Sequence, residues 1–376
     1  MESQVRPVRG REELEQCFEL WGDVFDEDRG FFQRRLEGDR TYDSATTWVA
    51  VVGGEVVSAA QIFPFDARWD GTTLLVAGIG SVATRPTHRG QGLALAVLNA
   101  QRAWMAPAGF ALALLFARER AIPLYERAGY VRLPFGTTVA WSPDDGATRS
   151  GYTVRSVKPA DWRAIRTIYA AQMAPLGHVR SKAFWTDAIR WTEQVDPGRE
   201  WLVAEQAGRL AGYFFGRIPE VGEDEEGPTV QGRRIRLWEV VSHLNHPGAA
   251  EALVERAHRQ MGAPGMVPLS LPAGHVLAEG RPVIPGRHRG MWSLVSAPAL
   301  LRAIHPVLAR RAEDAGVPAL TLGERPDGVR LVWAAGERTL AGADFLEAVI
   351  CGRDDDPWLG ALFPPATLFL WSLDQF

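Results

Sequence analysis

The stretch Arg89-Gly90-Gln91-Gly92-Leu93-Ala94 decides the fold, because a strand is expected before it and a helix after it. Upstream, residues 74–83 are largely apolar and predict a strand that runs into a basic turn. Downstream, Leu93, Val97, Ala100 and Trp104 recur at helical spacing. The N–H groups of a first helical turn bind anions, and glycines let the backbone approach a ligand closely. The stretch therefore predicts a site for a phosphate-bearing ligand.

This turn differs from the common nucleotide-binding signatures. A P-loop needs Lys followed by Ser or Thr, and a dinucleotide fold needs a third glycine and a later acidic residue. The pattern here is Arg-x-x-Gly-x-Ala after a strand that ends in Val82-Ala83. It resembles the pyrophosphate-binding motif of the GNAT acyltransferases, which hold acetyl coenzyme A. The six residues alone also fit a solvated turn before an ordinary core helix.

A second motif follows about 30 residues later. Residues 111–117 are apolar and predict a buried strand. Residues 121–130 predict a short helix with Pro123 in its first turn and Gly129 at its end. This resembles the second GNAT hallmark, the helix whose tyrosine (here Tyr125) approaches the cofactor sulfur. The two motifs in this order favour a GNAT domain at residues 1–150.

Composition limits the remaining classes of function. The 376 residues, 46% of them hydrophobic, predict two or three domains, and a net charge of -4 with a pI near 6.1 gives no basic footprint for nucleic acid. Two cysteines argue against a disulfide framework. No signal-like core and no apolar run of membrane-spanning length are present. We expect a soluble cytoplasmic protein without membrane or nucleic-acid partners.

The chain contains an apparent internal repeat. A short strand, an amphipathic helix and a hairpin occur at residues 5–60, with the turn at Gly53-Gly54. The same order recurs at residues 154–214, with the turn at Gly208, and predicts a tandem duplication. The second copy lacks the Arg-x-x-Gly-x-Ala turn, since Ser242–Gly248 stands in its place. One cofactor per chain is expected, bound by the first copy.

A third region begins near Gly290. It predicts a helix near residues 300–308 interrupted by Pro306, then alternating strands and a helix. The tail, 368–376, is apolar and is expected to be tied into a core. This region resembles a sterol-carrier-like domain. The predicted fold class is α/β (α+β), with a GNAT domain at 1–150, a degenerate copy at 151–290 and the sterol-carrier-like module at 291–376.

That arrangement is similar, over essentially the whole chain, to the enhanced intracellular survival (Eis) acetyltransferases. One departure is the segment Ala117–Leu124 before the tyrosine, which is often shorter in that family. The resemblance implies a homo-oligomer and transfer of an acetyl group from acetyl-CoA to an amine by direct attack in a ternary complex. It implies that Tyr125 protonates the leaving thiolate, although Tyr125 also fits simple core packing. The residues expected to bind the cofactor are Val82, Ala83, Arg89, Gly90, Gln91, Gly92, Leu93 and Ala94; the N–H of Val82 or Ala83 would stabilise the thioester oxyanion.

The resemblance also assigns a role to the terminal residue. In Eis enzymes the C-terminal carboxylate reaches the active site, and here that group belongs to Phe376. An α-carboxylate has a pKa near 3.5 and an alkylammonium one near 10.4, so direct deprotonation is uphill by roughly 9 kcal/mol. There are three alternatives to this unfavourable direct transfer: burial raises the pKa of the carboxylate, a water relays the proton, or the carboxylate only orients the amine. The tail also fits burial for stability alone.

The acceptor site is expected beside the first helix. Asp23, Asp26, Glu27 and Asp28 follow that helix, and Phe31 and Phe32 come next. An acidic, aromatic-lined pocket suits a cationic amine such as an aminoglycoside, a polyamine or a lysine side chain. Trp21 and Trp48 are candidates for its border. The same residues also fit a solvated helix end.

Other chemistries find no support in the sequence. His243 and His246 lack further ligands, so no metal site is expected. No Gly-x-Ser-x-Gly elbow is present. The alternative function is a non-enzymatic GNAT scaffold that binds a lipid or another apolar ligand.

Overall fold

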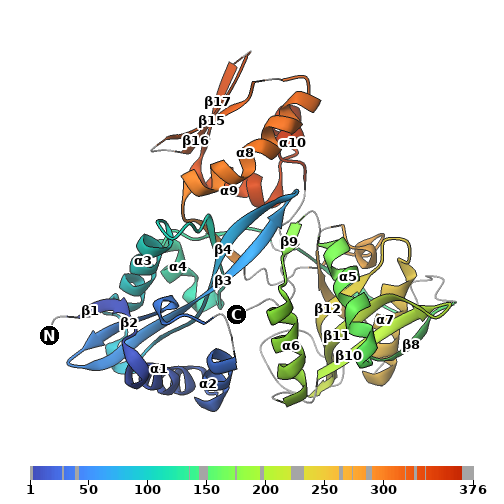
Figure 1. Ribbon diagram of the computed structural model, residues 1–376, viewed down its shortest axis with the longest axis horizontal. Coiled ribbons are helices and arrows are strands. Elements are labelled where there is room, and N and C mark those ends of the chain that lie inside the picture. Colours follow the sequence, from blue (N-terminus) through green and yellow to red (C-terminus); the bar gives the residue numbers. More distant parts are fainter. Residues whose placement is uncertain are drawn as a thin grey trace. The chain divides into compact units, whose positions relative to one another are not determined.

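The computed structural model describes residues 3–27, 29–38, 42–134, 136–143, 151–173, 176–194, 199–221, 233–261, 266–272, 274–284, 290–317, 319–325, 328–334 and 336–365. These residues form two compact units (Figure 1). The first contains the described residues up to 134 together with those of 290–365, and the second contains those of 136–284. The predicted sterol-carrier-like module at 291–376 thus falls in the same unit as the first GNAT copy, and its existence as a separate domain stays a prediction.

The first unit is built on one sheet with the strand order β1-β2-β3-β4-β5-β14-β6. Neighbouring strands are antiparallel except for β4 and β5, which are parallel. The bounds are Gln4–Pro7 (β1), Thr47–Val52 (β2), Glu55–Trp69 (β3), Thr72–Thr84 (β4), Leu112–Phe116 (β5), Val131–Arg132 (β6) and Gly290–Leu294 (β14). The predicted hairpin at Gly53-Gly54 is confirmed as the β2–β3 connection.

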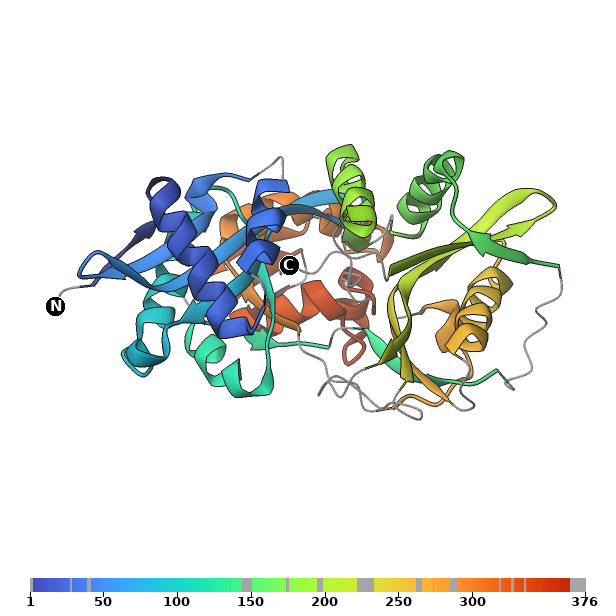
Figure 2. The ribbon, with the colours of Figure 1, turned by 90° about the horizontal axis from the view of Figure 1, so that it is seen from below.

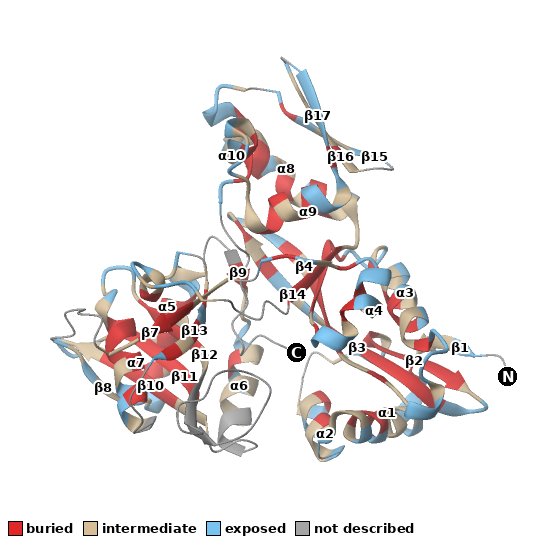
Figure 3. Cartoon of the chain, turned by 180° about the vertical axis from the view of Figure 1, so that it is seen from behind, coloured by how far each residue is buried: buried red, intermediate tan, exposed pale blue. Residues whose placement is uncertain are grey.

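Helices cover both faces of this sheet, because successive residues of a strand point to opposite sides. Val49, Val56 and Ala59 pack against α1 (Gly10–Phe25) and α2 (Arg29–Gly38). Their neighbours Ala50 and Val57 pack against α3 (Leu93–Met105) and α4 (Ile122–Arg127) on the other face. The buried residues accordingly lie along the strands and in the helices that cover them, drawn in red in Figure 3.

A bulge interrupts the pairing of β4 with β3. Ala83 lies opposite Ala59 and Gly80 lies opposite Gln61, so two residues of β4 face one residue of β3. Ser81 takes up the extra length with a left-handed φ of 51°. The parallel pairing of β4 with β5 stops at Ile79, just before the bulge. Beyond that point the two strands part, and one edge of β4 is left open between Ser81 and Thr84.

The strand β14 belongs to the first sheet, not to a separate module. It lies between β5 and β6 and pairs with both. The strand that follows β6 in the sequence, β7 (Thr137–Trp141), pairs instead with β13 (Val267–Leu271) in the second unit. The domain boundaries at residues 150 and 291 stay predictions; in the structure β7 pairs within the second unit and β14 pairs within the first sheet.

The second unit contains a sheet of strand order β12-β11-β10-β8. α5 (Trp162–Gln172) and α7 (Gly248–Met261) lie on opposite faces of it (Figure 2), and α6 (Lys182–Gln194) precedes β10. Its core is aromatic, with Trp201 stacked on Phe215 at a ring distance of 4.1 Å. The strand bounds are Thr153–Ser156 (β8), Arg199–Gln206 (β10), Arg209–Val221 (β11) and Arg233–Ser242 (β12), and the predicted hairpin at Gly208 is confirmed.

The rest of the first unit is α8 (Ala297–Asp314), a three-stranded sheet, α9 (Gly342–Cys351) and α10 (Pro357–Leu362). The predicted interruption at Pro306 is wrong, since α8 continues through it. Pro306 removes one backbone hydrogen bond, but the buried side chains of Ile304 and Val307 beside it hold the helix in place. The strands of the small sheet are Thr321–Arg325 (β15), Gly328–Trp333 (β16) and Gly336–Ala341 (β17).

The apolar tail with Phe376, which was expected to be tied into a core, lies outside the described residues. Within the described part of the chain, no helix is long and apolar enough to cross a membrane. The same residues contain no group of three or more His, Cys, Asp or Glu side chains arranged to hold a metal ion.

Candidate active site

The predicted phosphate-binding turn has the geometry that its glycines suggested. After a short 3-10 helix, η2 (Pro86–His88), the backbone takes left-handed φ values at Gly90 (78°) and Gly92 (76°). Gly92 is the N-cap of α3. Residues other than glycine rarely adopt these φ values, so the two glycines allow the chain to turn sharply from β4 into α3.

The turn presents free hydrogen-bond donors on an exposed surface. The first backbone bond of α3 runs from Ala96 N to Gly92 O at 2.9 Å, so the N–H groups of Leu93 and Ala94 have no acceptor within the helix. Gly90, Gln91 and Gly92 are exposed. The Arg89 side chain is exposed as well, and its Nε lies 3.3 Å from Thr84 O. These donors fit a pyrophosphate, because helix N-terminal amides and a guanidinium both favour phosphate oxygens.

The open edge of β4 distinguishes Val82 from Ala83. Arg85 N donates to Val57 O of β3 at 2.9 Å. Alternate N–H groups of an extended strand point to opposite sides, so the Ala83 N–H also faces β3 while the Val82 N–H faces the opening. Ser58 Oγ, on β3, donates to Ala83 O at 2.9 Å, in agreement with this register. Of the two candidates, Val82 is the one whose amide is available to a ligand between β4 and β5.

Tyr125 lies on α4, on the same face of the sheet as α3. Its side chain is 8% exposed and packs edge-on against Tyr130, with ring centroids 6.2 Å apart. Burial raises the pKa of the Tyr125 hydroxyl to about 12. Among the described residues this hydroxyl has no hydrogen-bond partner, so it can donate to a bound molecule.

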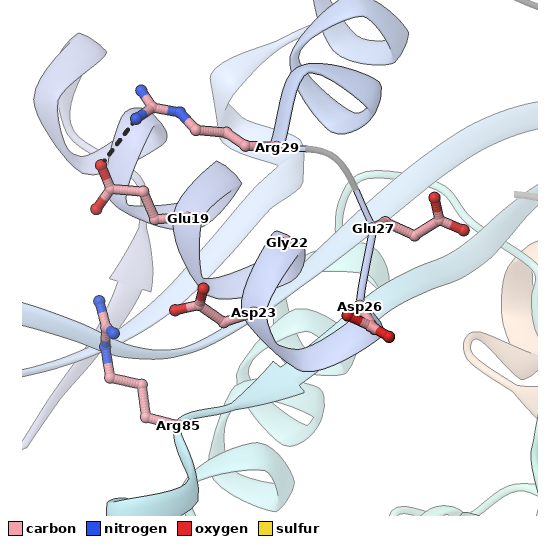
Figure 4. A pocket seen from close by; sticks show the side chains of 7 residues that line it. All are labelled: Glu19, Gly22, Asp23, Asp26, Glu27, Arg29 and Arg85. Carbon is pink, nitrogen blue, oxygen red and sulfur yellow. Dashed lines mark hydrogen bonds and ion pairs between the residues drawn. The ribbon is translucent and has the colours of Figure 1, made fainter.

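An acidic pocket of about 680 Å³ lies at the end of α1 (Figure 4). Its walls carry four carboxylates and two guanidiniums, from Glu19, Asp23, Asp26, Glu27, Arg29 and Arg85, with Gly22 between them.

Of the four pocket carboxylates, Glu19 is neutralised by an arginine and, among the described residues, the other three are not. Arg29 pairs with Glu19 at 3.0 Å, and Arg85, at the end of β4, pairs with Glu55 at 2.9 Å. Asp23, Asp26 and Glu27 form no ion pair with described residues and are exposed. The pocket surface is therefore negative where the sequence predicted an acceptor site.

The predicted aromatic lining of this pocket is corrected. Trp21 is fully buried and packs against Phe18 and Phe32, with ring centroids 6.1 and 5.7 Å away. Phe32 is also buried. Trp21 does not line the pocket, because the helical spacing that puts Asp23 on the surface turns Trp21 inward. Trp48 is buried as well and packs on Trp104, on the α3 face of the sheet.

Some features of the site carry no sequence signal. Arg85 was not predicted as a site residue, yet it lines the acidic pocket. The bulge at Ser81 is preceded by Gly80, but a single glycine in an apolar strand does not locate a bulge. Asp28 and the Phe376 carboxylate lie outside the described residues.

Comparison with known proteins agrees with this geometry. Residues 4–132 match the model of the acetyltransferase (GNAT) domain family. The N-acetyltransferase Eis of Mycobacterium tuberculosis (strain CDC 1551 / Oshkosh) and that of Mycobacterium bovis (strain BCG / Pasteur 1173P2) are each 30% identical over an alignment of 175 residues that covers 39% of this chain. The match spans 42% of the length of these curated relatives, less than half.

Solved structures are similar over the full length of the chain. A GCN5-related N-acetyltransferase from Anabaena variabilis has a TM-score of 0.71 at 15% identity, and the two chains cover each other completely. Eis1 from Mycobacterium abscessus has a TM-score of 0.64 at 18% identity, again with complete coverage of both chains. At these identities the likeness establishes the fold, which is α/β. Residues 4–132 of this chain are a GNAT acetyltransferase domain.

Proposed function

We propose that this protein is an N-acetyltransferase that moves the acetyl group of acetyl-CoA to an amine of a cationic acceptor by direct attack in a ternary complex. The observation that carries the proposal is the combination of the open edge of β4 with the donor-rich turn at its end. The turn follows β4, in which the Val82 N–H faces the opening, and leads into α3. A pyrophosphate on the turn would allow the pantetheine arm to enter between β4 and β5.

The chain's own groups divide the work on acetyl-CoA. The amides from Gly90 to Ala94 and the Arg89 guanidinium would hold the pyrophosphate. The Val82 N–H would donate to the carbonyl oxygen of the thioester as negative charge develops there during attack. The neutral amine nitrogen forms the new bond to the acetyl carbon, the bond from that carbon to sulfur breaks, and the proton that the nitrogen loses passes to solvent water. The products are the N-acetylated acceptor and coenzyme A.

Tyr125 is proposed to give its proton to the departing sulfur. A thiol in water has a pKa near 8.5, so transfer from a phenol with a pKa of about 12 is uphill by roughly 5 kcal/mol at ~1.4 kcal/mol per unit. Burial raises the pKa of a thiol as it raises that of a phenol. The thiol of coenzyme A, bound in the same apolar surroundings, therefore has a pKa closer to that of Tyr125. At neutral pH the raised pKa keeps Tyr125 protonated and ready to donate.

The pocket at the end of α1 is the proposed acceptor site. Its exposed carboxylates, Asp23, Asp26 and Glu27, attract a cationic amine, and this supports an aminoglycoside, a polyamine or a lysine side chain as acceptor. The terminal carboxylate of Phe376 is proposed to bind or orient the ammonium, with direct deprotonation disfavoured by the pKa difference. A sterol-carrier-like C-terminal module, homo-oligomeric assembly and a cytoplasmic location are further parts of the proposal.

The test is coenzyme A thiol release from acetyl-CoA with a panel of aminoglycosides, polyamines and lysine peptides. Release with one class of amine, and a mass increase of one acetyl group on that amine, is the expected result. Absence of release with every amine, although acetyl-CoA binds, would contradict the proposed acceptor class. Absence of acetyl-CoA binding would favour the alternative, a non-enzymatic scaffold for an apolar ligand.

A further inference from the structure

The orientation of Tyr125 depends on what holds the ends of a very short helix. α4 has six residues, and isolated helices shorter than about 12 residues are marginal in water. The position of the Tyr125 hydroxyl is therefore set by contacts outside α4. Residues 128–132 follow the helix directly and lead into β6.

The C-terminal end of α4 is closed by a tight turn. Gly129 has a left-handed φ of 83°, and Tyr130 N donates back to Tyr125 O at 3.0 Å. This is the arrangement in which a glycine ends a helix and its last carbonyls find new donors. The turn leaves the carbonyl of Ala128 directed toward α3.

Arg102, on α3, contacts this turn and β14 at the same time. Its Nη2 donates to Leu294 O at 2.9 Å, and its Nη1 donates to Ala128 O at 3.4 Å. A Cβ at position 129 would overlap Arg102 Nη1, so the guanidinium packs directly on the glycine backbone. One side chain thus links α3, which begins at the phosphate-binding turn, to the end of α4 and to a strand from residues 290–294.

Tyr130 extends this contact to Tyr125. Tyr130 is buried beside Arg102 and packs edge-on against Tyr125, with an interplanar angle of 73°. Burial raises the pKa of Tyr130, and the positive charge of Arg102 partly offsets the rise. Displacement of the guanidinium would therefore disturb both the turn after α4 and the ring against which Tyr125 rests.

We propose that Arg102 is a positioning residue for Tyr125: its guanidinium fixes the end of α4 against β14 and so aims the Tyr125 hydroxyl. The inference rests on the proposed function, in which Tyr125 is the proton donor. A misplacement of a catalytic group by about 1 Å can cost 100-fold in rate. Arg102 itself acts only through Tyr125 and has no assigned contact with substrate.

A double-mutant cycle tests this directly. The kcat for thiol release is measured for the wild type, Arg102→Met, Tyr125→Phe and the double variant. Arg102→Met is expected to lower kcat between about 10- and 100-fold in the wild type and less than about 2-fold in the Tyr125→Phe background, because residues that act together are not additive. An equal loss in both backgrounds would overturn the proposal.

Two further variants separate positioning from a general loss of charge or stability. Arg102→Lys keeps the charge and one donor, and it is expected to recover part of the lost kcat. Arg68→Met removes an arginine of β3 that has no hydrogen bond or ion pair among the described residues, and kcat is expected to stay within 2-fold of the wild type. Thermal unfolding of each variant shows whether a loss of kcat reflects unfolded protein.

A measurement without turnover keeps the inference independent of the proposed chemistry. With 3-fluorotyrosine in place of Tyr125, the ¹⁹F resonance reports the packing of that ring. Arg102→Met is expected to shift and broaden the resonance, and Arg68→Met to leave it unchanged. If Tyr125→Phe is fully active, the proton-donor role fails while a shifted resonance still supports positioning. An unchanged resonance in Arg102→Met overturns the positioning role whatever the activity.

Discussion

Trp292 of β14 lies opposite Leu114 of β5 and, on its other side, opposite Val131 of β6 in antiparallel register. In the sequence, β5 precedes and β6 follows α4, the helix that carries Tyr125. A strand from a distant part of the sequence therefore completes the sheet around the candidate catalytic tyrosine. Trp292 is fully buried there.

A fragment of residues 1–150 is predicted not to fold stably, because it lacks β14 and leaves β5 and β6 without their shared partner. The expected result is no cooperative thermal transition and no measurable acetyl-CoA binding by calorimetry, in contrast to the full chain. In the full chain, Trp292→Ala is expected to cost about 3–5 kcal/mol of unfolding free energy. A fragment that unfolds cooperatively and binds acetyl-CoA with the Kd of the full chain would refute the dependence on β14.

Gly92→Ala is predicted to weaken acetyl-CoA binding about 10-fold, because a left-handed φ strains any residue with a Cβ by roughly 1–2 kcal/mol and the turn would relax away from the phosphate. Calorimetric Kd values measure the effect. Gly54→Ala is the matched control, since Gly54 also has a left-handed φ (88°) with open space around it but lies in the β2–β3 turn. Equal weakening by both variants would show that strain in general, and not this turn, is responsible.

Asp26→Asn is predicted to raise the KM for a cationic amine several-fold while the Kd for acetyl-CoA stays unchanged. The carboxylate is unpaired among the described residues, and asparagine tolerates the left-handed φ of 55° at this position. Steady-state kinetics at low and high salt measure the effect, which should shrink as salt screens the charge. Glu12→Gln removes a charge from the first turn of the same helix and is expected to leave KM within 2-fold. The reverse ranking of the two variants would argue against an acceptor at this pocket.

Acid is predicted to destabilise the second unit through His275. Its Nδ1 accepts from Leu277 N at 3.2 Å, so Nε2 carries the proton and donates to Val240 O at 3.1 Å. Burial lowers the pKa of His275 from 6.5 to about 4. Between these values the unfolded chain binds the proton and the folded chain does not, so stability rises with pH; it is complete above 6.5 and is lost toward pH 4.

The shift corresponds to at most about 3.5 kcal/mol at ~1.4 kcal/mol per unit. Urea unfolding at pH 7 and pH 4.5 measures it, with His275→Gln as the variant that keeps a donor for Val240 O but does not titrate. The loss of unfolding free energy on acidification should be smaller in His275→Gln. An identical loss in both proteins would exclude His275 as the cause.

The local parts of the site were predictable from sequence, and the distant ones were not. Gly90, Gly92 and Tyr125 belong to contiguous motifs, in which the turn and the helix depend on residues close by in the sequence. The insertion of β14 between β5 and β6 depends on pairing between segments far apart, which no local pattern encodes. Trp21 was misplaced because an aromatic beside acidic residues fits a pocket wall and a core equally well until the face of the helix is known. Pro306 was taken as a break, although packing on both sides keeps α8 continuous.

The most direct test of the central claim compares thiol release from acetyl-CoA by the wild type, Tyr125→Phe and Tyr152→Phe in the presence of a cationic amine. Tyr152 is a half-buried tyrosine of the second unit and serves as a matched loss of a phenol hydroxyl. General acid catalysis contributes typically 10²–10⁴-fold. The account predicts release by the wild type, a loss of about 100-fold or more in kcat for Tyr125→Phe, and a kcat within 2-fold of the wild type for Tyr152→Phe. Full activity of Tyr125→Phe, or no release by the wild type with any cationic amine, would contradict it.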